Sequence, residues 1–185
     1  METLISGAGF FLWPLGFCSL LAVFVILERL IALRAAKSVP VEILPLIIAG
    51  DFKSAATAFP QSIAGRIVKF FNEESPDKDA LTAYAKLEVS RMERGLFLLD
   101  SVIAIAPLIG LFGTVYGLFI LFPESGGLPD QETLTRGVGL ALTTTMLGLF
   151  IAIPALFMNN LILRRIDIIA ARLELIIERL SAKNQ

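Results

Sequence analysis

Three long stretches of this chain contain no charged residue, and they constrain the fold more than any other feature. They are residues 3–27, 101–123 and 137–163. Each exceeds the roughly 20 residues with which an α-helix crosses a hydrocarbon core about 30 Å thick. The chain of 185 residues is 56% hydrophobic with a mean hydropathy of +0.77, well above the apolar content of ordinary soluble domains. The sequence therefore predicts an all-α polytopic membrane protein with three transmembrane helices.

The basic residues are unevenly distributed around these helices, and this predicts their orientation. Of the 16 Lys and Arg residues, Arg136 alone lies on the side of the N-terminus and the loop 123–136. Arg29, Arg91 and Arg164 are among those that flank the membrane on the other side. Since cytoplasmic flanks carry the excess of Lys and Arg, we expect the N-terminus outside and the C-terminus inside. Basic residues follow the first helix instead of preceding it, so we expect a retained helix and not a cleaved signal peptide.

The predicted organisation has six segments. They are an N-terminal tail with transmembrane helix 1 (1–28), a cytoplasmic helical region (29–95), transmembrane helix 2 (96–122), a periplasmic loop (123–136), transmembrane helix 3 (137–163) and a cytoplasmic C-terminal helix (164–185). In the cytoplasmic region, Gly50 and Asp51 are typical of a helix stop followed by an N-cap. Apolar residues keep helical spacing from Leu81 to Ile103, which predicts that helix 2 extends unbroken into the cytoplasm.

Helix 3 is predicted to extend into the cytoplasm as well. After the charge-free stretch, apolar residues recur every three or four positions from Ile162 to Leu180, which is the a and d spacing of a helical bundle. Such a short seam fits assembly of several chains around an axis, and it fits packing on the chain's own 35–95 region equally well. The sequence leaves both interpretations open.

Small residues form rows at three- and four-residue spacing in helices 2 and 3. The residues in question are Gly110, Gly113 and Gly117 in helix 2, with Gly148 and Ala152 in helix 3. Lipid tails are as apolar as leucine, so membrane helices associate through close backbone approach, for which small side chains are needed. We therefore expect these five residues to pack helices against one another.

Threonines accompany these rows. Thr143, Thr144 and Thr145 are consecutive in helix 3, and Thr114 lies between two glycines of helix 2. A threonine in a membrane helix often donates to its own i−4 carbonyl and has no further role, which is our expectation for Thr143. Thr114 and Thr145 share faces with the small-residue rows, so we interpret them, with the adjacent Thr144, as candidate hydroxyls of a polar path.

The composition excludes several function classes. The chain has no histidine and one cysteine, Cys18, inside the first apolar stretch. This removes His-based metal sites and the Ser-His and Cys-His nucleophile pairs, so we expect neither an enzyme nor a resident metal or organic cofactor. The net charge is −1 and the membrane topology accounts for the basic residues, so no nucleic-acid partner is expected.

The charge-free stretches also limit how ions could cross. Moving protons or cations through a bilayer requires an ionisable or densely polar site, so another chain would have to supply the carboxylate. Asp100 and Glu28 lie near the predicted inner boundary and are candidate cytoplasmic exit groups. The alternative is that both are ordinary interfacial charges.

Two ordered motifs relate the chain to a known family. The stretch "APLIGLFGTVYG" fits A-P-x-x-G-L-x-G-T-V-x-G, and "ALTTTMLGLFIAIPA" fits A-L-x-x-T-x-x-G-L-x-x-A-I-P-A. With them, the segments 91–119 and 137–160 resemble the ExbB/TolQ/MotA proton-channel family, and most closely its three-span ExbB/TolQ branch. "ERL" at 28–30 and "AGDFKSAATAF" at 49–59 match weaker family features. The likeness covers nearly the whole chain.

The resemblance implies a homopentameric ring in which helices 2 and 3 line a central pore. The pore would hold the single transmembrane helices of two partner chains of the ExbD/TolR type, whose aspartate takes up the transported H⁺ or Na⁺. Thr114 and Thr145 correspond to the family's pore threonines. The implied function is a motor in the bacterial inner membrane that energises TonB-dependent outer-membrane transport or Tol-type envelope maintenance, with a TonB/TolA-like protein as a further partner.

Two features depart from the ExbB/TolQ pattern. That branch usually has a glutamate five residues before the second pore threonine, where this chain has Leu140. Thr144 beside Thr145 resembles the paired threonines of sodium-driven flagellar stators. A sodium-driven variant and a structural membrane scaffold without conduction therefore stand as alternatives.

Overall fold

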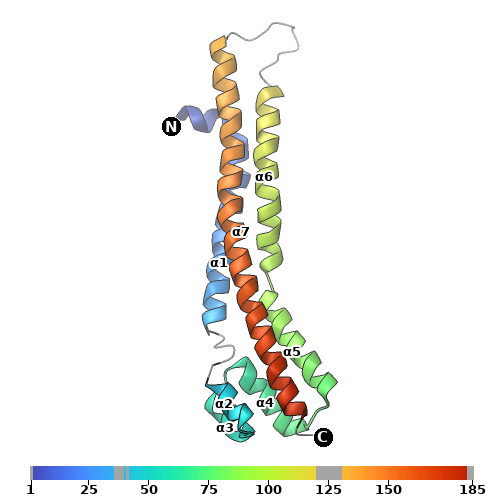
Figure 1. Cartoon of the computed structure of the whole chain (residues 1–185). Helices are drawn as coiled ribbons and strands as arrows, with labels where there is room; N and C mark the ends of the chain where they lie inside the picture. Colours follow the sequence, from blue (N-terminus) through green and yellow to red (C-terminus); the bar gives the residue numbers. More distant parts are fainter. Residues whose placement is uncertain (1, 36–39, 41, 120–130, 183–185) are drawn as a thin grey trace. The chain divides into compact units, whose positions relative to one another are not determined.

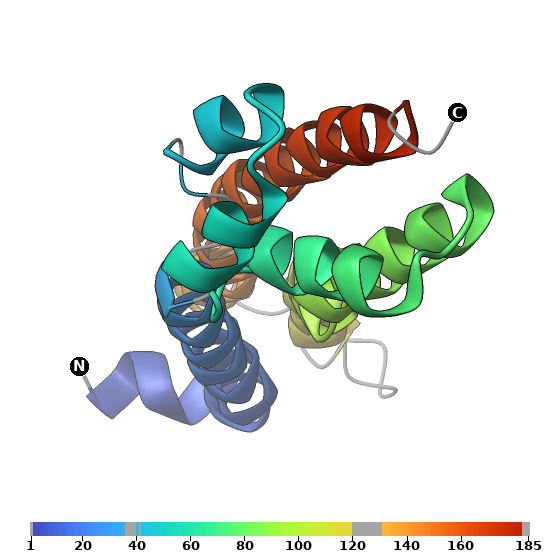
Figure 2. The ribbon, with the colours of Figure 1, turned by 90° about the horizontal axis from the view of Figure 1, so that it is seen from below.

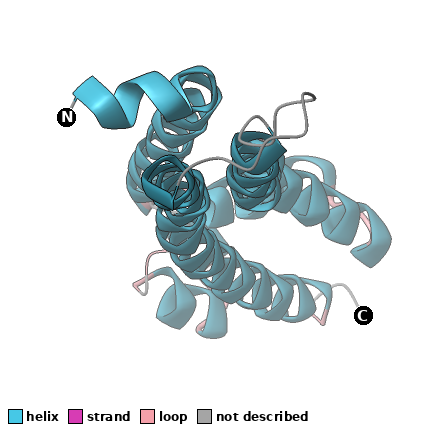
Figure 3. Cartoon of the chain, turned by 90° about the horizontal axis from the view of Figure 1, so that it is seen from above, coloured by secondary structure: helices cyan, strands magenta, loops and turns pink. Residues whose placement is uncertain are grey.

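The computed structural model describes residues 2–35, 40, 42–119 and 131–182 (Figure 1). Every regular element among these residues is an α-helix, as Figure 3 shows, so the predicted helical class is confirmed for the described part of the chain. The helices are α1 (Glu2–Ala35), α2 (Ile43–Ile48), α3 (Phe52–Ala58), α4 (Ile63–Glu74), α5 (Lys78–Glu93), α6 (Leu96–Phe119) and α7 (Gln131–Ser181). Most of the predicted periplasmic loop lies outside the described residues.

Among the described residues, three helices are long and apolar enough to cross a membrane. The segments concerned are Phe10–Leu33, Leu96–Phe119 and Gly137–Ser181. Large apolar side chains are exposed along all three, among them Trp13, Phe17, Phe24, Phe112, Phe119, Phe150 and Phe157. So much apolar surface is not stable in water, and lipid or other apolar chains must cover it. The chain is therefore a multi-pass membrane protein, as predicted.

The chain divides into two compact units. The first, here called the apolar unit, comprises Met1–Leu27 and Gly95–Asn160, and the second, the charged unit, comprises Glu28–Arg94 and Leu161–Gln185. Helices α1 and α7 each contribute one part to either unit. The two units are described separately below.

The core of the apolar unit is a seam on α1 packed against α6 and α7. Every third or fourth residue of α1 is buried, namely Phe11, Leu15, Cys18, Ala22 and Val25. Four of these five, all but Phe11, form one cluster with Leu99, Val102 and Ala106 of α6 and Ala155 of α7. The spacing matches the 3.6-residue helical period, so one stripe of each helix is buried and the remaining surface faces outward.

The charged unit contains a series of short helices, α2 to α5, in which each packs beside the next (Figure 2). Three of them begin with a side-chain cap: Asp51, Ser62 and Asp77 accept hydrogen bonds from the backbone N–H groups of Ser54, Gly65 and Ala80. Such caps satisfy backbone donors that have no partner within the helix. The N-cap predicted at Asp51 is therefore confirmed.

The apolar seam of α7 packs within its own chain. All six of its residues are buried in the single chain: Ile162, Ile166, Ile169, Leu173, Ile176 and Leu180. A seam that is already covered cannot serve as the contact between copies. Of the two interpretations that the sequence left open, packing on the chain's own helical region is the one that the structure supports.

The predicted unbroken extension of helix 2 is wrong. Helix α5 ends at Glu93 and α6 begins at Leu96, because Gly95 has a φ of +91°. This left-handed conformation is open to glycine and strained for residues with a side chain. Apolar spacing is helical on both sides of the break, which is why the periodicity did not reveal it. Helix α7, in contrast, continues without a break to Ser181.

The cap at Asp51 makes the start of α3 sensitive to acid. The Ser54 hydroxyl and then the Ser54 backbone N–H hold the pKa of Asp51 below its ordinary value. Because the pKa is lower in the folded state, the ionised carboxylate stabilises the fold fully at pH values above the unfolded-state pKa of about 3.9. This stabilisation is lost as the pH falls through the folded-state pKa.

We expect the first turn of α3 to loosen below about pH 4, measured as a loss of helical ¹³Cα shifts at residues 52–55 in detergent micelles. Asp51→Asn keeps a capping oxygen without the titration, so its shifts should stay constant over the same range. An identical acid transition in Asp51→Asn would contradict this assignment.

Candidate functional site

Helices α6 and α7 lie side by side (Figure 1) because small residues let their backbones meet. A Cβ atom built on Gly148 would lie 2.5 Å from the carbonyl oxygen of Ala106, and one on Gly110 would lie 2.7 Å from that of Thr144. Both distances are shorter than real Cβ contacts, and the atoms approached belong to the backbone. No residue larger than glycine fits at either position without moving a helix.

The other predicted packing residues lie along the same contact. A Cβ atom on Gly113 would lie 2.8 Å from Oγ1 of Thr144, and one on Gly117 would lie 3.2 Å from the Cβ of Ala141. Ala152 of α7 is buried. The structure thus places four of the five small residues directly between α6 and α7 of one chain.

The close approach brings three threonine hydroxyls around one carbonyl oxygen. Oγ1 of Thr144 and Oγ1 of Thr145 each lie 3.0 Å from the Gly110 oxygen, and Oγ1 of Thr114 lies 3.2 Å from it. The hydroxyls of Thr114 and Thr145 are 2.5 Å apart. The Ala141 oxygen lies 3.1 Å from Oγ1 of Thr114 and 2.7 Å from that of Thr144. All three threonines predicted for the polar path therefore belong to one cluster.

The protons of this cluster have more than one arrangement. Each hydroxyl carries one proton and can also accept, whereas a carbonyl only accepts. If Thr114 donates to Thr145, Thr145 donates to the Gly110 oxygen; if Thr145 donates to Thr114, Thr114 donates to the Ala141 or Gly110 oxygen. Both arrangements use the same positions of the heavier atoms. The hydroxyl pair can therefore reverse its direction of donation without moving either helix.

Burial separates the three hydroxyls into two kinds. Thr144 is 2% exposed and lies between the two helices, while Thr114 and Thr145 are only half-buried in the single chain. The latter two are accessible from outside the helix pair. Thr143 lies apart from the cluster, and its hydroxyl donates to the Gly139 oxygen four residues back at 2.9 Å, as predicted.

The two carboxylates predicted near the inner boundary have partners in their own units. In the apolar unit, Nδ2 of Asn159 donates to Asp100 at 2.7 Å. In the charged unit, Glu28 forms an ion pair with Arg29 at 2.7 Å. The sequence reasoning missed Asn159, which is 3% exposed; the signal was an asparagine pair, Asn159 and Asn160, inside a charge-free stretch.

The structure does not describe the side chains at two positions of interest. These are Leu140, where the ExbB/TolQ pattern has a glutamate, and Arg136, on which the predicted orientation depends. Among the described residues, no group of three His, Cys, Asp or Glu side chains is arranged to hold a metal ion.

The fold and the site define a class of protein before any comparison is made. Three long apolar helices, two of them in close glycine contact around a cluster of threonine hydroxyls, define an all-helical multi-pass membrane protein. The model of the MotA/TolQ/ExbB proton channel family matches residues 58–175, which is more than half of the chain. The chain belongs to this family.

Individual relatives agree with the family match. The biopolymer transport protein exbB1 of Vibrio cholerae is 29% identical over 94% of this chain and 84% of its own length. ExbB of Helicobacter pylori J99 is 36% identical over 50% of this chain and 66% of its own length. An ExbB homolog of Methanothermobacter thermautotrophicus is 37% identical over 57% of this chain, which spans only 38% of that relative.

The glycine contact can be tested by adding one methyl group. We expect Gly148→Ala to destabilise the chain by roughly 1–3 kcal/mol, because the new Cβ would overlap the Ala106 carbonyl. The measurement is the midpoint of thermal unfolding in detergent, followed by circular dichroism. Gly139→Ala is the matched control on the same helix, since a Cβ there meets nothing within 4 Å. Equal midpoints for the two variants would show that the close contact is absent.

Proposed function

We propose that this chain is the ring-forming, ion-conducting subunit of an ion-driven motor in the bacterial inner membrane. The observation that carries the proposal is the half-buried pair of Thr114 and Thr145 hydroxyls, 2.5 Å apart, in a helix pair whose charge-free stretches contain no Asp, Glu, Lys, Arg or His. Hydroxyls can pass a proton along or solvate an ion, but an ion also needs a charged acceptor within the membrane.

A partner chain supplies that acceptor in our proposal. The partner is of the ExbD/TolR type, with one membrane span that carries an aspartate, and two copies occupy the centre of a homopentamer of the present chain. Helices α6 and α7 then face the centre, and the accessible hydroxyls of Thr114 and Thr145 face the partner's carboxylate. Thr144 is buried, and its role is to fix the Gly110 and Ala141 carbonyls around which the pair is arranged.

The orientation proposed is the one that the basic residues predict, with the N-terminus outside and the C-terminus inside. Asp100 and Glu28 then lie towards the cytoplasm and serve as exit groups for the ion. Rotation of the pentamer around the partner dimer would transmit work, through a TonB/TolA-like protein, to outer-membrane transport or envelope maintenance. The names of the relatives, which refer to biopolymer transport, support the transport form of this proposal.

Protons are the transported ion that the cluster favours. A hard cation is held by several oxygen ligands at once. The additional threonine of this chain, Thr144, is engaged between the helices and adds no oxygen at the accessible edge. Two hydroxyls can pass a proton to the partner's carboxylate, whereas a sodium site needs further oxygen ligands from the partner. A sodium-driven variant is thus the second candidate.

The threonines provide a test against a non-conducting scaffold. The chain is reconstituted with its partner in liposomes, and proton uptake is followed with a pH-sensitive dye under an imposed potential. We expect Thr145→Val and Thr114→Val each to reduce uptake by about tenfold or more, equivalent to about 1.4 kcal/mol in the barrier. Thr143→Val is the matched control and should leave uptake unchanged, because that hydroxyl donates to the Gly139 carbonyl of its own helix and lies apart from the cluster.

Unchanged uptake in both pore variants, with the complex intact on size-exclusion chromatography, would rule out the hydroxyl path. If the unmodified complex also took up no protons, the non-conducting scaffold would be the remaining interpretation. Replacing all sodium by potassium should not alter proton uptake, and a flux that requires sodium would favour the sodium-driven variant.

A further inference from the structure

A cavity in the charged unit combines basic and apolar walls. It lies between α1, α4 and α5 and has a volume of about 250 Å³. Its walls include three arginines, Arg29, Arg66 and Arg91, the carboxylate of Glu88, and apolar side chains such as Leu33 and Ile63. The two pore motifs contain none of the residues that line this cavity, although Arg29 belongs to the "ERL" feature and pairs with Glu28, one of the proposed exit groups.

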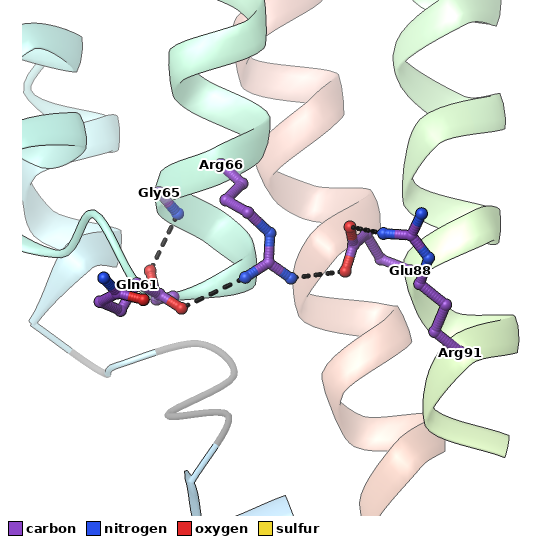
Figure 4. A network of polar contacts seen from close by, with 6 residues as sticks. Gln61, Gly65, Arg66, Glu88 and Arg91 are labelled. Carbon is purple, nitrogen blue, oxygen red and sulfur yellow. Dashed lines mark hydrogen bonds and ion pairs between the residues drawn. The ribbon is translucent and has the colours of Figure 1, made fainter. Parts of the chain in front are cut away.

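Glu88 fixes two of the arginines, as Figure 4 shows. Its side chain is 3% exposed, and its two oxygens accept from Arg66 at 2.5 Å and from Arg91 at 3.0 Å. The other terminal nitrogen of Arg66 donates to the Gln61 carbonyl at 3.3 Å. A buried carboxylate thus connects α4 to α5 and holds both guanidinium groups in place before any ligand arrives.

The fixed guanidinium groups keep donors for a ligand. An arginine carries five N–H donors, and Glu88 and Gln61 occupy only some of them. The side chains of Arg66 and Arg91 are 41% and 62% exposed, so their remaining donors are accessible. The third arginine, Arg29, is anchored by Glu28 and by the Met92 carbonyl. With Glu28 and Glu88 both counted, the three arginines leave a net positive charge at the cavity.

The place of the cavity along α1 indicates which anion it suits. Helix α1 is unbroken from Glu2 to Ala35, and Arg29 follows the charge-free stretch 3–27 after a single residue. By its place in the chain, Arg29 is expected where the apolar helix leaves the membrane, a depth at which phospholipid phosphates are found, and Arg29 lines the cavity. Its volume is below the range typical of pockets for drug-sized ligands, and its apolar wall suits the first carbons of an acyl or glycerol group.

We propose that this cavity binds the phosphate head group of an anionic phospholipid. The guanidinium groups of Arg66 and Arg91 donate charge-assisted hydrogen bonds to the phosphate oxygens, with Glu88 as the positioning residue. Arg29 contributes positive charge from α1, and Leu33 and Ile63 contact the apolar part of the lipid. None of the three threonines of the proposed ion path lines this site.

The test uses the full-length chain in a neutral detergent. Dioctanoyl phosphatidylglycerol is titrated and binding is followed by isothermal calorimetry, with dioctanoyl phosphatidylcholine and inorganic phosphate as separate arms. We expect phosphatidylglycerol to bind, phosphatidylcholine to bind at least about tenfold more weakly, and inorganic phosphate to bind weakly because it lacks the apolar part. Arg66→Gln and Arg91→Gln should each weaken phosphatidylglycerol binding about tenfold.

Controls separate the cavity from general surface charge. Arg164→Gln removes one exposed positive charge from the same unit and should leave the affinity unchanged. Arg91→Lys keeps the positive charge but lacks the planar guanidinium group, so its affinity for phosphatidylglycerol should be a few-fold lower. This variant replaces Arg91→Gln in the test if the glutamine variant fails to fold. Equal binding of the two lipids, or equal losses in Arg164→Gln and Arg91→Gln, would overturn the proposal. Tighter binding of inorganic phosphate than of phosphatidylglycerol would reassign the site to free phosphate.

Discussion

The backbone contact between α6 and α7 at Gly110 and Gly148 is the interaction on which the candidate site depends. It brings the Gly110 carbonyl within 3.2 Å of three hydroxyls from two helices. With any side chain at these glycines the helices would separate, and the hydroxyls of Thr114 and Thr145 could no longer meet. In lipid, where apolar contacts drive helix association weakly, such packing and interhelical hydrogen bonds hold the pair together.

The sequence predicted the elements governed by local chemistry. The lengths of the charge-free stretches identified the three apolar helices, the spacing of small residues identified their rows, and the residue types Gly50 and Asp51 identified the cap at Asp51. Features set by one backbone angle or by distant partners were missed. The break at Gly95 interrupts a continuous apolar period, and the burial of Asn159 depends on where α6 brings Asp100. The ion pairs of Glu88 with Arg66 and Arg91 join α4 to α5. The positions of these three residues in the sequence follow no motif that would have predicted the contact.

The two units divide the chemistry of the chain. The apolar unit holds Thr114, Thr144 and Thr145 as one cluster of hydroxyls, which stay neutral and need no counter-ion in the membrane. The charged unit carries most of the ionic groups and stabilises a buried carboxylate, Glu88, with two arginines. Burying such a charge is unfavourable unless it is paired, so these arginines are constrained even before a ligand binds. In the proposed function, conduction through the uncharged hydroxyl pair therefore requires a carboxylate from another chain.

That requirement is the central claim, and proton flux into liposomes tests it most directly. The chain is reconstituted alone, with its single-span partner, and with a partner whose membrane aspartate is changed to asparagine. The account predicts background flux for the chain alone, flux well above background with the native partner, and background again with the asparagine variant. Flux by the chain alone that equals that of the complex would contradict it.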